Sequence, residues 1–390
     1  MNNKAPKNIV IVPDSFKGSL SAIDVCLIIS EALKAKIQDL NIKCIPVADG
    51  GEGSVDAFLA SLLGKRINVN VRGPYGEQIE SFYGLMNNGC AVVEMAAAAG
   101  LPLVGENRNA KKTTTFGVGE LILDAVKRGA RKIIIGLGGS ATNDGGCGMA
   151  SACGVHFYNS EGSEFVPVGE TLCEIARIDA SEIFSVLDGV EVITMCDINN
   201  PLCGEIGAAA MFAPQKGANP SDVKLLDAGL NHMASIIKRD IGMDVKNIPG
   251  AGAAGGAGAG MVAYFNSRLQ MGIDTVLDIC DFDNALKEAD LVISGEGSFD
   301  EQSLHGKVID GIAKRCKSKN VPLAIFAGKI DKDSIKPALE AGVSFLCCIN
   351  PENISIQKAI SHASGNLLAS VFAFADKLID GDLTEPFIQM

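Results

Sequence analysis

Short runs of apolar residues recur along the chain, and most of them lead into a loop rich in glycine and polar residues. The runs are NIVIV, IKCIPV, RKIII, VEVITM, ADLVIS and VPLAIF, which begin at residues 8, 42, 131, 190, 289 and 321. Continuous apolar runs of this length are typical of strands buried on both faces of a parallel sheet. The segment after the first run has helical spacing instead, with apolar side chains at Val25, Ile28, Ile29, Ala32 and Leu33. Such alternation predicts an α/β fold in which helices cover a mostly parallel sheet.

The middle of the chain has a different pattern. Residues 67–86 alternate between apolar and polar and contain GPYGE at 73–77, which predicts an antiparallel hairpin. Long glycine-rich segments follow around 136–148 and 250–260. We therefore expect two domains, a Rossmann- or flavodoxin-like three-layer α/β/α domain made by both chain ends and an inserted second α/β domain. Their expected ranges are 1–66 with 271–390 for the first domain and 67–270 for the second.

Composition and charge narrow the classes of partner. The 390 residues are 47% hydrophobic and 21% charged, which is ordinary for a globular protein. The net charge of −12 argues against binding to nucleic acid or to an anionic membrane. A phosphate site must then be built locally, from backbone N–H groups and a few Lys or Arg side chains.

The cysteines and the chain start favour a cytoplasmic protein. The twelve Cys include no CxxC pair, so we expect reduced thiols rather than disulfides or a metal site. The apolar run before Pro13 is too short for a signal peptide. No charge lies between Lys246 and Arg268, but the glycines there predict a loop leading into a helix rather than a membrane span.

Two glycine patterns resemble dinucleotide-binding loops. GLGGSA at 136–141 follows a predicted strand and matches G-x-G-x-x-A. GAGAAG at 250–255 matches G-x-G-x-x-G, but VKNIP before it is not a strand. One match of this kind is a weak signal, and it leaves open an NAD(P)-dependent oxidoreductase that uses the 136–141 loop.

Charged side chains gather in the loops after the predicted strands. Each loop alone is typical of an ordinary turn. Several together, at the carboxyl ends of parallel strands, favour a ligand site. The loops contain Asp14, Ser15 and Lys17, then Asp49 and Glu52, then Asp197, Lys216, Glu296 and Asp300.

Eight motifs, in order from about residue 9 to residue 330, together resemble the bacterial type 1 glycerate kinases (glycerate 2-kinases). They are PDSFKGSLSA, PVADGGEGSVDA, EMAAAAGL, TFGVGELI, GLGGSATNDGGCGM, CDINNPLCGEIGAAAMFAPQKGA, GAGAAGG and ADLVISGEGSFDEQSLHGK. The chain departs from the family at Ser298 and Phe299, where the family usually has Arg and Ile. Lys307 and Lys329 are the nearby cations that could replace that Arg.

The resemblance implies ATP-dependent phosphorylation of D-glycerate, with Mg²⁺, in a cleft between the two domains of a cytoplasmic enzyme. The usual product in this class is 2-phosphoglycerate, with 3-phosphoglycerate as the alternative. The expected partners are glycerate and ATP, with no nucleic acid or membrane, and a homodimer is left open. Two other classes remain open on the residues alone: the oxidoreductase and a non-catalytic sensor of a small carboxylate.

Within that reaction, each loop receives an expected role. Glycerate is expected at Asp14, Ser15, Lys17, Gly50, Gly51 and Glu52, with Lys17 on its carboxylate. ATP is expected at Gly138, Gly139, Ser140, Thr142, Asn143, Asp144 and Lys216. The expected catalytic residues are Asp197 as general base, Lys17 and Asp49. The expected Mg²⁺ ligands are Asp49, Asp300 and Glu296.

Overall fold

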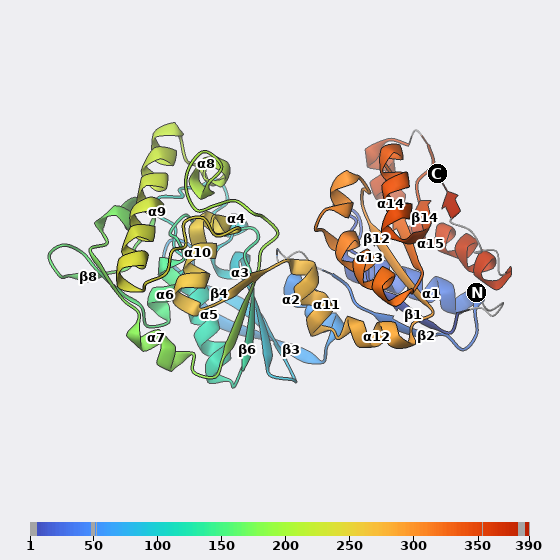
Figure 1. Cartoon of the computed structure of the whole chain (residues 1–390), viewed down its shortest axis with the longest axis horizontal. Helices are drawn as coiled ribbons and strands as arrows, with labels where there is room; N and C mark the ends of the chain where they lie inside the picture. Colours follow the sequence, from blue (N-terminus) through green and yellow to red (C-terminus); the bar gives the residue numbers. More distant parts are fainter. Residues whose placement is uncertain (1–5, 48–50, 52, 353, 381–386, 390) are drawn as a thin grey trace. The chain divides into compact units, whose positions relative to one another are not determined.

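The computed structural model describes residues 6–47, 51, 53–352, 354–380 and 387–389 (Figure 1). The chain divides into two compact units. Unit 1 contains both ends of the chain, Met1–Ala48 and Ile273–Met390, and unit 2 contains Asp49–Gly272. Each unit is an α/β structure with a six-stranded sheet, so the predicted fold class is confirmed.

All six strands of the unit 1 sheet are parallel, in the order β15-β14-β13-β12-β1-β2. This is the flavodoxin-like order with one added edge strand. The order reverses between β1 and β12, and such a switch point is where ligands bind in open α/β sheets. The strands are β1 (Asn8–Ile11), β2 (Asn41–Cys44), β12 (Leu291–Glu296), β13 (Leu323–Ala327), β14 (Val343–Cys348) and β15 (Phe387–Gln389).

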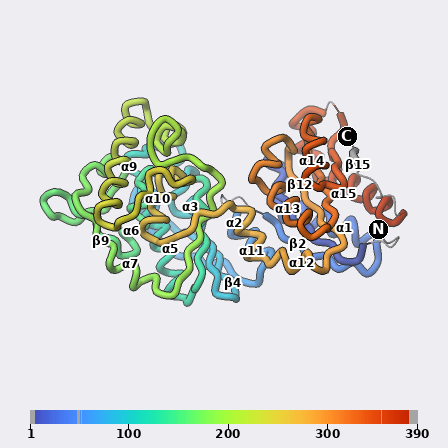
Figure 2. The backbone as a smooth tube through the Cα atoms, in the orientation of Figure 1, coloured from blue at the N-terminus to red at the C-terminus, as the bar shows by residue number. Residues whose placement is uncertain are grey.

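Helices make the outer layers of unit 1. Helix α1 (Ala22–Lys36) packs beside α15 (Ile356–Asp380), and both share one apolar core with the sheet (Figure 2). A capping box formed by Ser21 and Asp24 is present at the start of α1. The remaining helices are α11 (Gly272–Ile279), α12 (Phe282–Glu288), α13 (Val308–Lys319) and α14 (Ile335–Ala341), with a short 3₁₀ helix, η3, at Glu301–Leu304.

The unit 2 sheet is mixed, in the order β11-β10-β6-β5-β4-β3. Strands β5, β6, β10 and β11 are parallel, whereas β3, β4 and β5 form an antiparallel meander. The predicted hairpin is confirmed as β3 and β4, with its bend at residues 73–77. The strands are β3 (Gly64–Arg72), β4 (Gln78–Met86), β5 (Cys90–Glu94), β6 (Lys132–Gly136), β10 (Glu191–Met195) and β11 (Arg268–Gln270). A small second sheet has β7 (His156–Tyr158) between β8 (Glu164–Phe165) and β9 (Arg177–Asp179).

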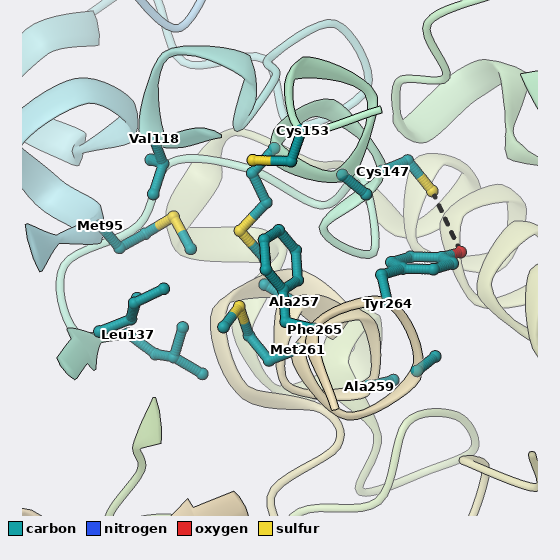
Figure 3. Close-up of a cluster of buried hydrophobic side chains, with 14 of the residues drawn as sticks. Met95, Val118, Leu137, Cys147, Cys153, Ala257, Ala259, Met261, Tyr264 and Phe265 are labelled. Atoms are coloured by element: carbon teal, nitrogen blue, oxygen red, sulfur yellow. Dashed lines mark hydrogen bonds between the residues drawn. The ribbon is translucent and has the colours of Figure 1, made fainter. Parts of the chain in front are cut away.

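The core of unit 2 forms around α10 (Figure 3). Tyr264 of this helix lies edge-on to Phe157, with 5.7 Å between ring centroids, and its hydroxyl lies 3.9 Å from the Cys147 Sγ. Small residues on α10 allow neighbouring backbones to approach closely. The helices of unit 2 are α2 (Ser54–Ser61), α3 (Met95–Ala99), α4 (Leu101–Val104), α5 (Phe116–Lys127), α6 (Cys147–Ala152), α7 (Ser181–Val186), α8 (Ala208–Phe212), α9 (Pro220–Asp240) and α10 (Ala253–Phe265), with 3₁₀ helices η1 (Gly169–Glu174) and η2 (Pro214–Lys216).

The first boundary between the two domains lies at a different residue from the one expected from the sequence. The expected first domain ran to residue 66, whereas unit 1 ends at Ala48. The difference arises because α2 packs against β4 and β5, and therefore belongs to unit 2. The return crossing lies between Gly272 and Ile273, against an expected boundary between 270 and 271.

No helix in the described residues combines the length and the apolar character that crossing a bilayer requires.

Candidate active site

A pocket of about 320 Å³ opens in unit 2 beyond the carboxyl ends of β6 and β10. Residues 138–140 after β6 line one part of it, and Asp197 after β10 lines another. Lys216 from η2 and the two alanines Ala253 and Ala254 at the start of α10 complete the wall. The structure thus brings together Gly138, Gly139, Ser140 and Lys216, which were expected to bind ATP, and Asp197, the expected base.

Lys216 is a buried lysine, only 2% exposed. Its Nζ donates to the Ser140 Oγ at 2.8 Å and to the Thr142 carbonyl at 2.7 Å. Burial lowers the pKa of its amine to about 7, and the negative charge of Asp144 opposes that shift. An ammonium has three N–H donors and these two bonds use two of them. Lys216 is therefore equipped to donate to an anionic ligand in the pocket.

The two glycine-rich segments pack against each other. The Gly145 N–H donates to the Gly255 carbonyl at 3.1 Å. A Cβ on Gly255 would lie 2.1 Å from the Thr142 carbonyl oxygen, and one on Gly260 would lie 2.4 Å from that of Gly145. Residues 254–256 all have positive φ, between 51° and 87°. The fingerprint match at 250–255 therefore coincides with a backbone-to-backbone contact rather than a strand-to-helix turn.

The Asp144 carboxylate is fully buried in the protein interior, where it accepts hydrogen bonds. Its Oδ2 accepts from the Thr115 N–H at 2.7 Å, the Thr115 hydroxyl at 2.8 Å and the Gly148 N–H at 3.2 Å. Its Oδ1 accepts from the Gly146 N–H at 3.1 Å. Burial raises the pKa of this carboxyl, and the hydrogen bonds counteract the rise. These bonds tie the glycine loop to the starts of α5 and α6.

Thr142 and Asn143 are also fully buried. The Thr142 Oγ1 and both amide atoms of Asn143 have no hydrogen-bond partner among the described residues. Within the described part of the chain, neither residue lines the pocket, and neither does Asp144. Direct contact of these three side chains with ATP stays a prediction.

Asp197 has a structural partner as well as a place in the pocket. Its Oδ1 accepts from the Gly272 N–H at 2.7 Å, at the first residue of α11. Its side chain is exposed, and its role as the general base stays a prediction.

A second set of expected site residues gathers in unit 1, at the switch point between β1 and β12. The Asp14 N–H donates to the Gly295 carbonyl at 2.8 Å, which holds the loop after β1 against the end of β12. Ser15 and Lys17 continue this loop, and Lys17 is exposed. Asp300 follows β12, and its Oδ1 accepts from the Gln302 N–H at 2.9 Å.

Glu296 is the buried member of this set, 8% exposed. Burial, together with the charges of Asp14 and Asp300, raises the pKa of its carboxyl to about 7, against the lowering effects of the Ser303 hydrogen bond and the Lys307 charge. Its Oε1 has no hydrogen-bond partner among the described residues. Such an oxygen is suited to a ligand that brings positive charge.

Comparison with known proteins decides the family. The model of the glycerate kinase family matches residues 9–378. The chain belongs to the glycerate kinase family. A glycerate kinase of Bacillus subtilis (strain 168) is 43% identical over 358 residues, which cover 91% of this chain and 94% of that protein. A glycerate 2-kinase of Escherichia coli (strain K12) is 43% identical over 327 residues, 83% of this chain and 86% of that protein.

The fold agrees with a solved structure. A crystal structure from Salmonella typhimurium LT2, named as a candidate glycerate kinase 2, superposes with a TM-score of 0.87 at 39% identity. The match covers 96% of this chain and 99% of that one. Membership of a kinase family implies that ATP is a substrate, so the oxidoreductase and sensor alternatives are not supported.

Several expected glycerate kinase residues lie outside the described residues. These are Asp49, Gly50 and Glu52. Gly51, expected at glycerate, lines the unit 2 pocket together with Ser140 and Lys216.

A metal site in this protein would rest on few protein ligands. Among the described residues, no three His, Cys, Asp or Glu side chains lie close enough together to bind one metal ion. Mg²⁺ in kinases commonly takes one or two carboxylates and completes its shell with water and phosphate oxygens. The unpaired Oε1 of Glu296, with Asp300 nearby, fits that sparser kind of site.

Glu94 is a residue that the sequence reasoning missed. This carboxylate, 2% exposed, ends β5, and its Oε1 accepts from the Val55 N–H at 2.7 Å, at the start of α2. It follows a continuous apolar run, the same signal that pointed to Asp197 after β10. The motif EMAAAAGL contains this residue, but the motif alone indicates no role for it.

Proposed function

We propose that this protein transfers the γ-phosphoryl group of ATP to the 2-hydroxyl of D-glycerate, giving 2-phosphoglycerate and ADP. Family membership supports the reaction, and the relative named glycerate 2-kinase supports the position. The cleft expected between the two domains stays a prediction.

The observation that carries the proposal is the Lys216 pocket. It combines a buried cation, the glycine-rich segment 138–140 and the Asp197 carboxylate in a space of about 320 Å³. Glycines let a ligand approach the backbone closely, and backbone N–H groups with a lysine are the usual way to hold phosphate oxygens. We assign the ATP phosphates to this pocket, with Lys216 donating to them.

The acceptor is assigned to the switch point of unit 1. Asp14, Ser15 and Lys17 follow β1 there, and Lys17 is the cation that would pair with the glycerate carboxylate. Glu296 and Asp300 would hold Mg²⁺, which would supply positive charge to offset the charge of the phosphates.

Asp197 is assigned as the general base. Its carboxylate accepts the proton of the 2-hydroxyl while that oxygen forms a bond to the γ-phosphorus. The bond between the γ-phosphorus and the oxygen that bridges it to the β-phosphorus breaks, and ADP leaves. Catalysis then depends mainly on positioning and on charge neutralisation.

A coupled ADP-release assay with D-glycerate tests the proposal, and phosphorus NMR of the product tests the position. We expect ADP release with D-glycerate, much less with L-glycerate or glycerol, and none when Mg²⁺ is chelated. A product that is entirely 3-phosphoglycerate would contradict the position. No ADP release, with glycerate-dependent absorbance changes of NAD(P)H instead, would contradict the reaction.

A further inference from the structure

We propose that Asp144 is a positioning residue for phosphoryl transfer, whose buried negative charge keeps the Lys216 amine in its ammonium form. The inference rests on the proposed role of Lys216 at the ATP phosphates. It gives Asp144 a part in the reaction that needs no contact with ATP.

The two groups that accept hydrogen bonds from Lys216 do little to offset the cost of burying its positive charge. Both hydrogen bonds of its Nζ go to neutral oxygens, those of Ser140 and Thr142. A neutral acceptor stabilises an ammonium less than a carboxylate does. Burial meanwhile favours the uncharged amine. The charge state of Lys216 therefore depends on the charged groups around it.

Two carboxylates of the described residues bear on this centre, those of Asp144 and Asp197. Asp144 lies in the same glycine loop as the two acceptors of Lys216, and its charge favours the ammonium. Asp197 also lines the pocket but is exposed, so solvent and salt weaken its effect. Arg108 donates to the Gln215 carbonyl at 3.0 Å and carries the opposite effect. Behind Asp144, burial keeps the Cys147 thiol and the Tyr264 phenol neutral by raising the pKa of each.

Asp144 itself can remain charged because four donors surround it. Three N–H groups and the Thr115 hydroxyl donate to its two oxygens. Hydrogen bonds of this kind stabilise a carboxylate against the cost of burial. None of the four donors carries a full charge, so the negative charge of Asp144 is left to act on Lys216.

The pH dependence of kcat/KM for ATP should report the charge of Lys216. Lys216 is needed as an ammonium, so kcat/KM for ATP should fall as the pH rises through the pKa of its amine, which is about 7. Removing the charge of Asp144 makes the ammonium less favourable and lowers that pKa. The alkaline fall of kcat/KM should therefore move to lower pH, by about one unit for a buried opposite charge nearby.

The test compares Asp144→Asn with Asp144→Glu. Both substitutions disturb the hydrogen bonds with Thr115, but only the first removes the charge. We expect the midpoint of the alkaline fall to move down by about one pH unit in Asp144→Asn and to stay in place in Asp144→Glu. Thr115→Val, which removes one donor and keeps the charge, should lower the melting temperature without moving the midpoint. An unmoved midpoint in folded Asp144→Asn would overturn the inference.

NMR of the unmodified protein covers the case in which Asp144→Asn does not fold. The carboxyl carbon shift of Asp144 should show an ionised group throughout the neutral range. A protonated Asp144 at neutral pH would overturn the inference.

Lys216→Arg separates this inference from the proposed function. Arginine stays charged, so the alkaline fall should disappear in this variant. If the fall disappears in Lys216→Arg but does not move in Asp144→Asn, only the role of Asp144 is wrong. If Lys216→Arg leaves the fall unchanged, the assignment of Lys216 fails and this inference fails with it.

Discussion

Lys216 shows at the scale of one residue how a functional group can reduce stability. The amine is almost fully buried and its pKa lies near 7, against about 10.5 for a free lysine. Between those two values the unfolded chain holds a proton that the folded chain lacks. Stability attributable to Lys216 therefore rises as the pH rises from about 7 toward the unfolded value.

Lys216→Met should accordingly raise the melting temperature while abolishing useful ATP affinity. Methionine has a similar length and needs no charge in a buried place, although two acceptors lose their donor. The gain should be largest below pH 7 and shrink at alkaline pH, because the wild-type penalty fades there. Thermal denaturation over a pH series and the KM for ATP measure the two effects.

Lys224→Met is the matched control for that experiment. Lys224 is exposed on α9, so its replacement should change neither the melting temperature nor the KM for ATP. A Lys216→Met protein that is less stable than wild type at neutral pH would show that the burial cost has been overestimated.

Asp197 joins a catalytic assignment to a structural hydrogen bond, and the two can be separated. Asp197→Asn keeps an oxygen that can accept from the Gly272 N–H but loses the negative charge. We expect kcat to fall by roughly two orders of magnitude or more, the usual loss for a general base, with an unchanged melting temperature. Asp197→Ala should lose both activity and some stability. Near-normal kcat in Asp197→Asn would assign the base elsewhere.

At the scale of elements, the sequence pattern predicted the features that depend on interactions between residues close together in the chain. The β3–β4 hairpin was predicted, and so were six further strands, because each depends on neighbours within a few residues. The six are β1, β2, β6, β10, β12 and β13. The contact between the two glycine-rich segments was not predicted. Gly145 and Gly255 meet through the backbone, and no residue pattern in either segment shows which partner it will have.

The same limit affected individual site residues. The motif PQKG is typical of a surface turn, yet its Lys216 is buried by elements distant in the sequence. Asp144 was grouped with ATP because it sits in the glycine loop, whereas its oxygens accept from α5 and α6. Residue type and loop membership predicted a shared region for Ser140, Lys216 and Asp197, which do line one pocket, but side-chain direction depended on tertiary packing.

The glycine contact predicts an unequal response to alanine. Gly255→Ala should be strongly destabilising, because its Cβ would meet the Thr142 carbonyl and its φ is +68°. Gly162→Ala is the matched control, with a φ of +80° and no atom within 4 Å of the added Cβ. The control should lose only the left-handed backbone cost, about 1 to 2 kcal/mol. Denaturant unfolding compares them, and equal losses would mean that the backbone contact contributes little.

At the scale of the whole molecule, the sequence predicted two α/β domains but misplaced their first border. The chain gives no compositional break near residue 48, and α2 reads equally well as a helix of either domain. Its membership of unit 2 depends on packing against β4 and β5. A domain boundary such as this one depends on which sheet a helix packs against, and a single sequence does not show that packing.

The acidic character of the whole chain leads to the last prediction, on substrate selectivity. A protein with a net charge of −12 tends to repel an anionic acceptor, so a cation at the site must provide attraction. We assign that cation to Lys17, which is exposed in the loop after β1. Glycerol lacks the carboxylate and would leave this contact unmade, so its kcat/KM should be lower than that of D-glycerate by roughly ten- to a hundredfold.

Lys17→Ala should narrow this gap by weakening glycerate while leaving glycerol nearly unchanged. Lys319→Ala is the control, since Lys319 is exposed at the end of α13 in the same unit and has no assigned role. The measurement is kcat/KM for both acceptors in the three proteins at one ionic strength, because salt screens exposed charges. A gap that persists in Lys17→Ala would place the carboxylate contact on another cation. Equal use of glycerol and glycerate by the wild type would refute the need for a carboxylate contact, whichever residue provides it.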